Sequence, residues 1–192
     1  MTAEQTTTLV IGSGFSALAM AAELDQQGIR AIVVDGSRPM KQHHTMGPTT
    51  GGISLAELSE RSEIVRLLEH YARRHELDLR PETRALELTC THQPAPMANR
   101  WQVQTASGIL CAHSVVFTRS ALSQLRRVLL GVGVTTAADV RAGMNALGLY
   151  LVGVGDLALP TTQEILHQAR RAGQSISARL AASELGTVPT LA

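Results

Sequence analysis

The chain has 192 residues, of which 44% are hydrophobic and 17% are charged. This composition predicts a single globular domain over residues 1–192, and the net charge of +1 gives no indication of nucleic-acid or anionic-membrane binding. No apolar run approaches the ~20 residues of a membrane span, and the first residues show no signal-peptide pattern, so we expect a cytoplasmic protein. The two cysteines, Cys90 and Cys111, form no C-x-x-C motif and are expected to be free thiols in strands.

The first recognisable unit is a strand, a turn, a helix and a second strand. Thr7–Ile11 is β-branched and apolar, as expected of a buried strand. A glycine-containing turn follows, and Leu18–Leu24 predicts a helix of small apolar residues that ends near Gly28. Ile29–Val34 predicts the second buried strand. This order is that of a βαβ unit in a parallel sheet.

The turn of this unit reads Gly12-Ser13-Gly14-Phe15-Ser16-Ala17. Gly12 permits a tight turn, Gly14 lets a pyrophosphate approach the backbone, and Ala17 permits close packing of helix on strand. The N–H groups of the helix N-terminus then face the phosphates. Asp35, at the end of the second strand, stands where a carboxylate accepts hydrogen bonds from ribose hydroxyls. The pattern predicts dinucleotide binding, and the alternative is a glycine-rich turn in an ordinary α/β protein.

A long polar loop and a helix come next. Residues 36–53 are rich in glycine, proline and threonine, and a loop of this length is usually functional or mobile. Ser54 and Glu57 have the spacing of a capping box before a helix in which apolar residues recur at helical spacing. Leu77–Leu79 predicts a brief third parallel strand that ends before Pro81.

Alternation of apolar and polar residues then predicts three short antiparallel strands, a β-meander. These strands lie at 86–90, at Trp101–Thr105 and at Ile109–Cys111, with the longest loop at His92–Asn99. Trp101 is expected to pack within this meander. Val115–Phe117 is a continuous apolar run and predicts a return to the parallel sheet.

The last third of the chain ends in a strand and a helix. Leu122–Leu130 predicts a helix, and the sequence up to residue 147 is mixed. Leu149–Val152 predicts a final buried strand, which runs into Gly153-Val154-Gly155-Asp156. Thr161 and Glu164 have capping-box spacing before a helix with one apolar face. The tail after Glu184 is expected to fray.

Four stretches together resemble the FAD-binding domain of the thioredoxin reductase and flavin-containing monooxygenase-like flavoproteins. These are Leu9–Asp35, Trp101–Gly108, Val115–Ala121 and Gly148–Asp156. The resemblance implies an α/β fold, a Rossmann-like FAD/NAD(P)-binding domain with a parallel sheet, helices and a three-stranded β-meander. It implies FAD as cofactor, with Asp156 on the ribityl chain and the following helix aimed at the flavin ring. The cofactor-binding residues so implied are Gly12, Ser13, Gly14, Phe15, Ser16, Ala17, Asp35, Gly36, Ser37, Ala85, Thr118, Gly155, Asp156 and Gln163.

The sequence also departs from this family. Only residues 122–147 separate the two later motifs, where the family has a complete NAD(P)H domain, so that domain is expected to be absent between 121 and 148. Gly131–Thr136 is interpreted as a turn, and the usual A-T-G tripeptide is Thr118-Arg119-Ser120. Without a C-x-x-C motif, disulfide chemistry of the thioredoxin reductase kind is excluded.

These features predict an FAD-binding flavoprotein, an oxidoreductase that takes electrons from a substrate or from a partner subunit. The alternative is a non-catalytic module that keeps the nucleotide-binding fold for a structural or interaction role. NAD(P) in the glycine-rich site is disfavoured because the Gly153–Asp156 motif has no role there. A homodimer or heteromer is expected, because loss of a domain would leave the flavin side of the sheet uncovered.

Catalytic residues are not identified by the sequence. His43 and His44 lie in the long loop, and an imidazole beside a flavin could donate or accept a proton. A solvated loop explains the same pair, and this interpretation is preferred. No metal site is expected, because no cysteine or carboxylate stands at ligand spacing nearby. His167, Arg170 and Arg171 are assigned to the solvent face of the last helix.

Overall fold

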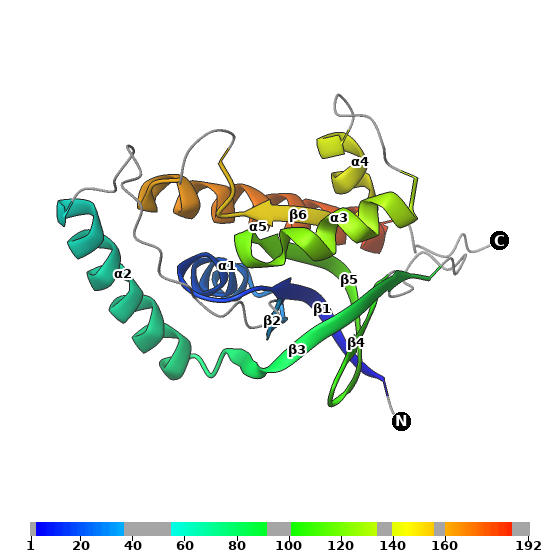
Figure 1. Ribbon diagram of the computed structural model, residues 1–192, viewed down its shortest axis with the longest axis horizontal. Helices are drawn as coiled ribbons and strands as arrows, with labels where there is room; N and C mark the ends of the chain where they lie inside the picture. The colour runs from blue at the N-terminus through cyan, green and yellow to red at the C-terminus, as the bar shows by residue number, and fades with distance from the viewer. Residues whose placement is uncertain (1–2, 37–54, 92–100, 134–139, 156–159, 186–192) are drawn as a thin grey trace.

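A parallel sheet forms the centre of the molecule, with helices packed against it (Figure 1). The computed structural model describes residues 3–36, 55–91, 101–133, 140–155 and 160–185. Backbone pairing gives the parallel strand order β3-β2-β1-β5-β6. The short strand β4 pairs antiparallel with both β3 and β5. The bounds are β1 (Glu4–Ile11), β2 (Ala31–Asp35), β3 (Asp78–Cys90), β4 (Trp101–Thr105), β5 (Gly108–Thr118) and β6 (Leu149–Val152).

Helices cover both faces of this sheet. On one face lie α1 (Phe15–Gln26), α2 (Leu55–Arg74) and α5 (Thr162–Leu185). The other face is covered by the β-meander, by α3 (Leu122–Gly131) and by α4 (Val140–Leu147). A single-turn 3-10 helix, η1 (Arg119–Ala121), links β5 to α3. The predicted Rossmann-like α/β fold with a three-stranded meander is therefore confirmed.

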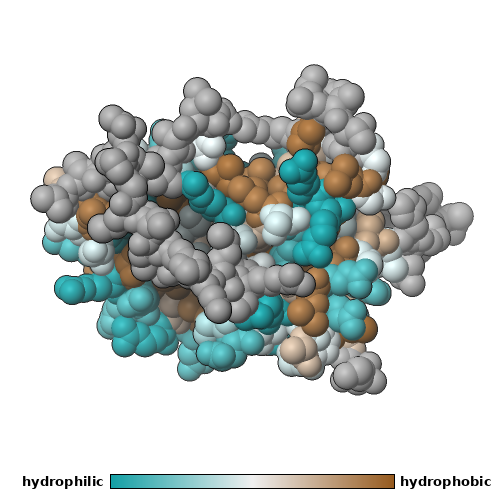
Figure 2. Space-filling model, in the orientation of Figure 1, coloured by the Kyte–Doolittle hydropathy of each residue, from teal (hydrophilic) through white to brown (hydrophobic). Residues whose placement is uncertain are grey.

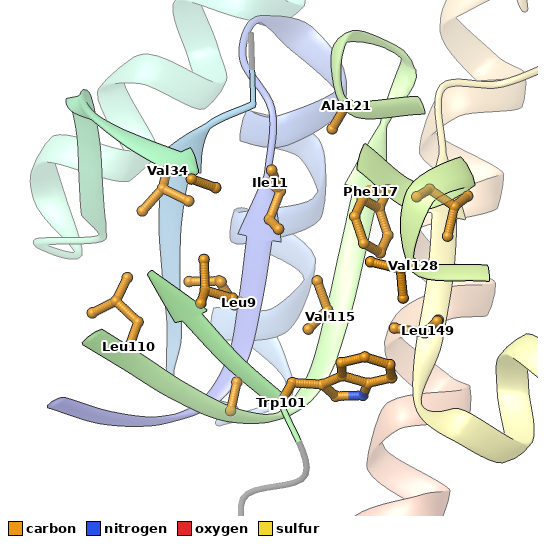
Figure 3. Close-up of a cluster of buried hydrophobic side chains, with 14 of the residues drawn as sticks. Leu9, Ile11, Val34, Trp101, Leu110, Val115, Phe117, Ala121, Val128 and Leu149 are labelled. Carbon is orange, nitrogen blue, oxygen red and sulfur yellow. The ribbon is translucent and has the colours of Figure 1, made fainter. Parts of the chain in front are cut away.

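The sheet separates two hydrophobic cores, as the alternation of side chains along a strand requires. Val10 of β1 packs with α1 and α5, while Leu9 and Ile11 face the meander. Figure 3 shows the second core, in which Trp101 of β4 extends toward Leu149 of β6. Because the carboxyl end of β1 is buried on both faces, its residues Leu9–Ile11 are all apolar.

Trp101 lies at the centre of the meander-side core and is fully buried. Its indole N–H donates to the backbone carbonyl of Leu147 at 2.8 Å, so the ring joins β4 to the last residue of α4. The expected packing role of Trp101 is confirmed. Among the cysteines, Cys111 is buried and Cys90 is half-buried, and both are free. Burial raises the pKa of the Cys111 thiol.

Several predicted elements are confirmed with adjusted bounds. The first strand begins at Glu4, three residues before the prediction, and the first helix extends beyond Leu18–Leu24 at both ends. The final strand has the predicted bounds, Leu149–Val152. The last helix has the predicted capping box, since Thr161 N–H donates to Glu164 at 2.7 Å and Glu164 N–H donates to Thr161 Oγ1 at 3.2 Å. The Ser54 cap, the His92–Asn99 loop and the tail beyond 185 lie outside the described residues.

The prediction that the third strand ends before Pro81 is wrong. β3 continues through the proline, so one strand serves both the parallel sheet and the meander. Arg80 pairs with Val34 of β2, and the next pair joins Arg84 to Asp35. Residues 81–83 therefore fall in a gap of this ladder, where the missing N–H of Pro81 breaks no pairing.

The strands expected at Ile109–Cys111 and Val115–Phe117 are likewise one continuous strand, β5. β5 pairs with β4 through residues 108–112, with β1 through residues 110–117 and with β6 through residues 115–118. The sequence beyond α3, which gave no clear prediction, contains the helix α4. In the described part of the chain, no helix is long and apolar enough to cross a membrane.

Candidate functional site

The glycine turn lies at the carboxyl end of β1, where β5 also ends. Gly12 donates its N–H to the Val34 carbonyl at 2.8 Å and has a φ of +145°. A Cβ built on Gly12 would lie only 1.7 Å from Oγ1 of Thr118. Position 12 therefore requires glycine for a second reason beyond the turn, because Thr118 is packed directly against it. Oγ1 of Thr118 in turn lies 3.1 Å from Oγ of Ser120.

Gly14 caps the N-terminus of α1 and leaves it open. Its φ of +73° and ψ of −157° are accessible chiefly to glycine, and a Cβ built on it meets no atom within 4 Å. The first helical N–H to bond the backbone is that of Leu18, which donates to the Gly14 carbonyl at 3.1 Å. The cap residue makes no side-chain hydrogen bond, and the first turn contains no acidic residue. The preceding N–H groups and the positive end of the helix dipole are therefore available to an anion.

Gly153, the residue after β6, lies against this same helical turn. A Cβ on Gly153 would lie 2.1 Å from Oγ of Ser16 in the first turn of α1. Gln168 of α5 holds the loop, since its Oε1 accepts from Gly153 N–H at 2.8 Å and its Nε2 donates to the Val154 carbonyl at 3.0 Å. Gly155, which follows, is exposed. Two segments separated by over a hundred residues thus meet at one edge of the sheet.

The end of β2 packs beneath η1 at this edge. A Cβ on Gly36 would lie 2.7 Å from Cβ of Ala121 and 3.0 Å from Cγ2 of Ile11. Asp35 is half-buried immediately before this glycine. Ala85, on β3, is buried and its carbonyl accepts a hydrogen bond from Nε2 of Gln124. The structure therefore brings the ends of β1, β2, β5 and β6 together, as expected of parallel strands.

Sequence reasoning missed Arg61, which joins α2 to both helix N-termini. Its Nε donates to Thr162 Oγ1 at 3.2 Å, and its NH2 group donates to the Pro160 carbonyl at 3.0 Å. The guanidinium carbon lies 5.7 Å from the centre of the Phe15 ring, a cation–π geometry. Nothing in the local pattern separates Arg61 from the other charged residues of α2, because its partners are about a hundred residues away.

Gln163 lies at the start of α5 and is exposed, and its Nε2 donates to Glu60 of α2 at 3.0 Å. Glu164 stands in the first turn of α5 and bonds the Thr161 N–H, so this helix supplies its own acidic cap. The N-terminus of α1 is thus the more open of these two helix N-termini. Four predicted site residues lie outside the described residues, namely Ser37, His43, His44 and Asp156.

Comparisons with known proteins bear on the fold. No protein-family model matches the chain, and no curated protein matches it. Among solved structures, Thermovibrio ammonificans THI4 is similar over 92% of this chain and 90% of its own, with a TM-score of 0.60 and 13% sequence identity. The fold is shared along nearly the whole chain. At this identity the likeness concerns the fold alone.

Two further matches are shorter. Bacillithiol disulfide reductase from Staphylococcus aureus matches over 60% of this chain with a TM-score of 0.41 and 12% identity. A thioredoxin reductase from Gloeobacter violaceus matches over 59% with a TM-score of 0.39 and 13% identity. The alignments span 38% and 36% of those two proteins.

Proposed function

We propose that this chain is an FAD-binding flavoprotein. The observation that carries the proposal is the open N-terminus of α1 behind Gly14, at the sheet edge where the β6–α5 loop also arrives. A pyrophosphate accepts hydrogen bonds from such N–H groups and is favoured by the helix dipole. The absence of any atom within 4 Å of a Cβ at Gly14 leaves room for this contact.

The residues at this sheet edge fit two parts of the cofactor, the pyrophosphate and the ribose. Ser13 and Gly14 are exposed beside the N–H groups that would hold the pyrophosphate, and Asp35 stands at the end of β2 for the ribose hydroxyls. Arg61 adds a fixed positive charge between α1 and α5, held by two hydrogen bonds. When bound, FAD supplies reversible two-electron chemistry, and the protein supplies binding, orientation and electrostatics.

We further propose an oxidoreductase without an NAD(P)H domain of its own between β5 and β6. In the described part of that interval lie only η1, α3 and α4, whereas domains typically need ~50 residues or more. Electrons would then come from a substrate or a partner subunit. A homodimer or a heteromeric partner that supplies these electrons belongs to the same proposal.

Fluorescence titration with FAD tests the cofactor site. Gly14→Ala should weaken binding at least tenfold, about 1.4 kcal/mol, because its Cβ occupies the space left for the pyrophosphate. Gly28→Ala is the matched control, since Gly28 also has a positive φ, +71°, and open space, but lies at the other end of α1. Equal FAD affinity of the two variants would show that Gly14 does not face the cofactor.

A further inference from the structure

A cavity lies on the meander side of the sheet, between α3 and the strands β3 and β4. Its volume is about 870 Å³, within the range of ~300–1,000 Å³ found for small-molecule sites. Ile11 reaches it from the end of β1, but no residue of the Gly12–Ala17 turn and no residue of α5 lines it. Figure 2 shows hydrophobic surface on this face, including the region where Figure 1 draws α3 and β3. Ala85, a predicted cofactor-binding residue, also lines it, so the cavity adjoins the candidate dinucleotide site but is not lined by its glycine turn.

The walls of this cavity are mainly apolar. Leu88 of β3, Val128 of α3 and Leu147 contribute aliphatic surface, and Trp101 contributes an aromatic ring. Trp101 is fully buried and its indole N–H is bonded to the Leu147 carbonyl, so it adds no free polar group to the wall. Figure 3 shows that this ring extends from β4 toward Val128 and Leu149. Such walls favour a flat, hydrophobic molecule.

One buried polar group in the lining lacks a partner. Gln124 of α3 is 9% exposed, and its Nε2 donates to the carbonyl of Ala85. A carbonyl oxygen only accepts hydrogen bonds, so this contact fixes the orientation of the amide. Oε1 of Gln124 is buried and accepts no hydrogen bond from any residue that the structure describes. A buried acceptor without a donor is destabilising, which makes Oε1 the polar contact that a ligand would satisfy.

We propose that this cavity binds an uncharged aromatic or fused-ring molecule that carries an N–H or O–H donor directed at Oε1 of Gln124. The apolar ring is favoured by the aliphatic walls that surround the buried Trp101. The cavity lining does not favour a ligand of either charge, because it includes one acidic residue, Glu87, and one basic residue, Arg127. The site differs from the dinucleotide edge in offering one acceptor in apolar surroundings, where the edge offers several N–H donors to an anion.

A pair of probes tests this assignment on the unmodified protein. 2-Naphthol and 2-methoxynaphthalene share the fused ring, but only 2-naphthol has an O–H donor. Trp101 is the single tryptophan of the chain, so its indole N–H resonance reports on the cavity without overlap. Both probes should shift this resonance, and 2-naphthol should bind roughly 2- to 12-fold more tightly, the ratio expected of one net hydrogen bond. Saturating FAD should not displace either probe.

Two variants separate the hydrogen bond from the cavity. Gln124→Leu should bind both probes equally, and Leu88→Phe should weaken both because the larger ring fills the space. Leu67→Gln is the control, since this leucine is 69% exposed on α2 and outside the cavity lining. Thermal unfolding verifies that each variant is folded. An unshifted Trp101 resonance, equal affinities of the two probes for the native chain, or unchanged binding to Leu88→Phe would overturn the proposal and indicate a cavity filled by water.

Discussion

Substitution of Gly12 should destabilise the fold more than substitution of any ordinary loop glycine. A Cβ at this position would lie 1.7 Å from Oγ1 and 2.7 Å from Cβ of Thr118, and the φ of +145° is strained for an L side chain. Overpacking in a core costs about 1–3 kcal/mol, and backbone strain of this kind costs about 1–3 kcal/mol more. Gly12→Ala should therefore lower the free energy of unfolding by roughly 2–6 kcal/mol.

Urea denaturation followed by Trp101 fluorescence measures this loss. Gly14→Ala is the comparison, because its backbone is also strained but its Cβ meets no atom within 4 Å, so only the strain of about 1–3 kcal/mol is expected. Combining Gly12→Ala with Thr118→Gly removes the clashing side chain and should recover about 1–3 kcal/mol relative to the sum of the single changes. If the losses of unfolding free energy from the two single changes simply add in the double variant, or if Gly12→Ala is as stable as the native chain, the contact with Thr118 is not the cause of the destabilisation.

Three further predictions concern charges and the electron source. A hydrogen bond from Arg80 lowers the pKa of Glu4. The pair therefore stabilises the fold fully at any pH above the ordinary carboxyl pKa, and this stabilisation is lost as the pH falls through the lowered pKa of Glu4. Arg80→Gln should raise the pKa of Glu4 in a carboxyl ¹³C titration, and an unchanged value would contradict the pairing. Arg61→Ala should speed amide hydrogen exchange in the first turns of α2 and α5, because its hydrogen bonds to Pro160 and Thr162 are lost. Alanine at an exposed arginine of α2 is the control and should leave this exchange unchanged. Equal exchange in both variants would show that Arg61 does not hold α2 against α5. The FAD-loaded chain alone should oxidise NADPH no faster than free flavin, and brisk turnover would exclude the proposed loss of an NAD(P)H domain.

Local patterns predicted those parts of the fold that depend on neighbours in sequence. The capping box of Thr161 and Glu164 lies within four residues, and the apolar run Leu149–Val152 is bounded by glycines on both sides. Both therefore appear in the sequence with nearly their final limits. The glycine turn before α1 is predictable for the same reason, since strand, turn and helix follow one another without interruption.

Features that depend on distant contacts were not predictable in this way. Hydrophobic alternation cannot show that β3 and β5 each bend from one sheet region into another, because both halves read as ordinary strands. The tolerance of Pro81 depends on a gap in its pairing with β2, which only the register reveals. Gly12 carries a visible turn signal, but its contact with Thr118 arises from a strand more than a hundred residues away.

In the candidate site, too, the residues of local motifs were predictable and those that depend on distant contacts were not. Gly14 and Asp35 stand where their motif places them, while Arg61 reaches the site through contacts with Pro160 and Thr162 that no local pattern contains. The burial of Gln124, whose Oε1 has no donor among the described residues, is likewise visible only once α3 is packed against β3. Polar residues on helices are usually exposed, so burial of this one had no signal in the sequence.

Whether the chain holds FAD is read most directly from its absorption spectrum after incubation with FAD and gel filtration. We expect the protein peak to carry the flavin bands at one FAD per chain, and denaturation should release this flavin because no covalent link is expected. Flavin bands of the native chain should be retained by Gly28→Ala and lost from Gly14→Ala. A folded, FAD-incubated protein peak with no flavin absorbance would contradict the claim that the open N-terminus of α1 holds this cofactor.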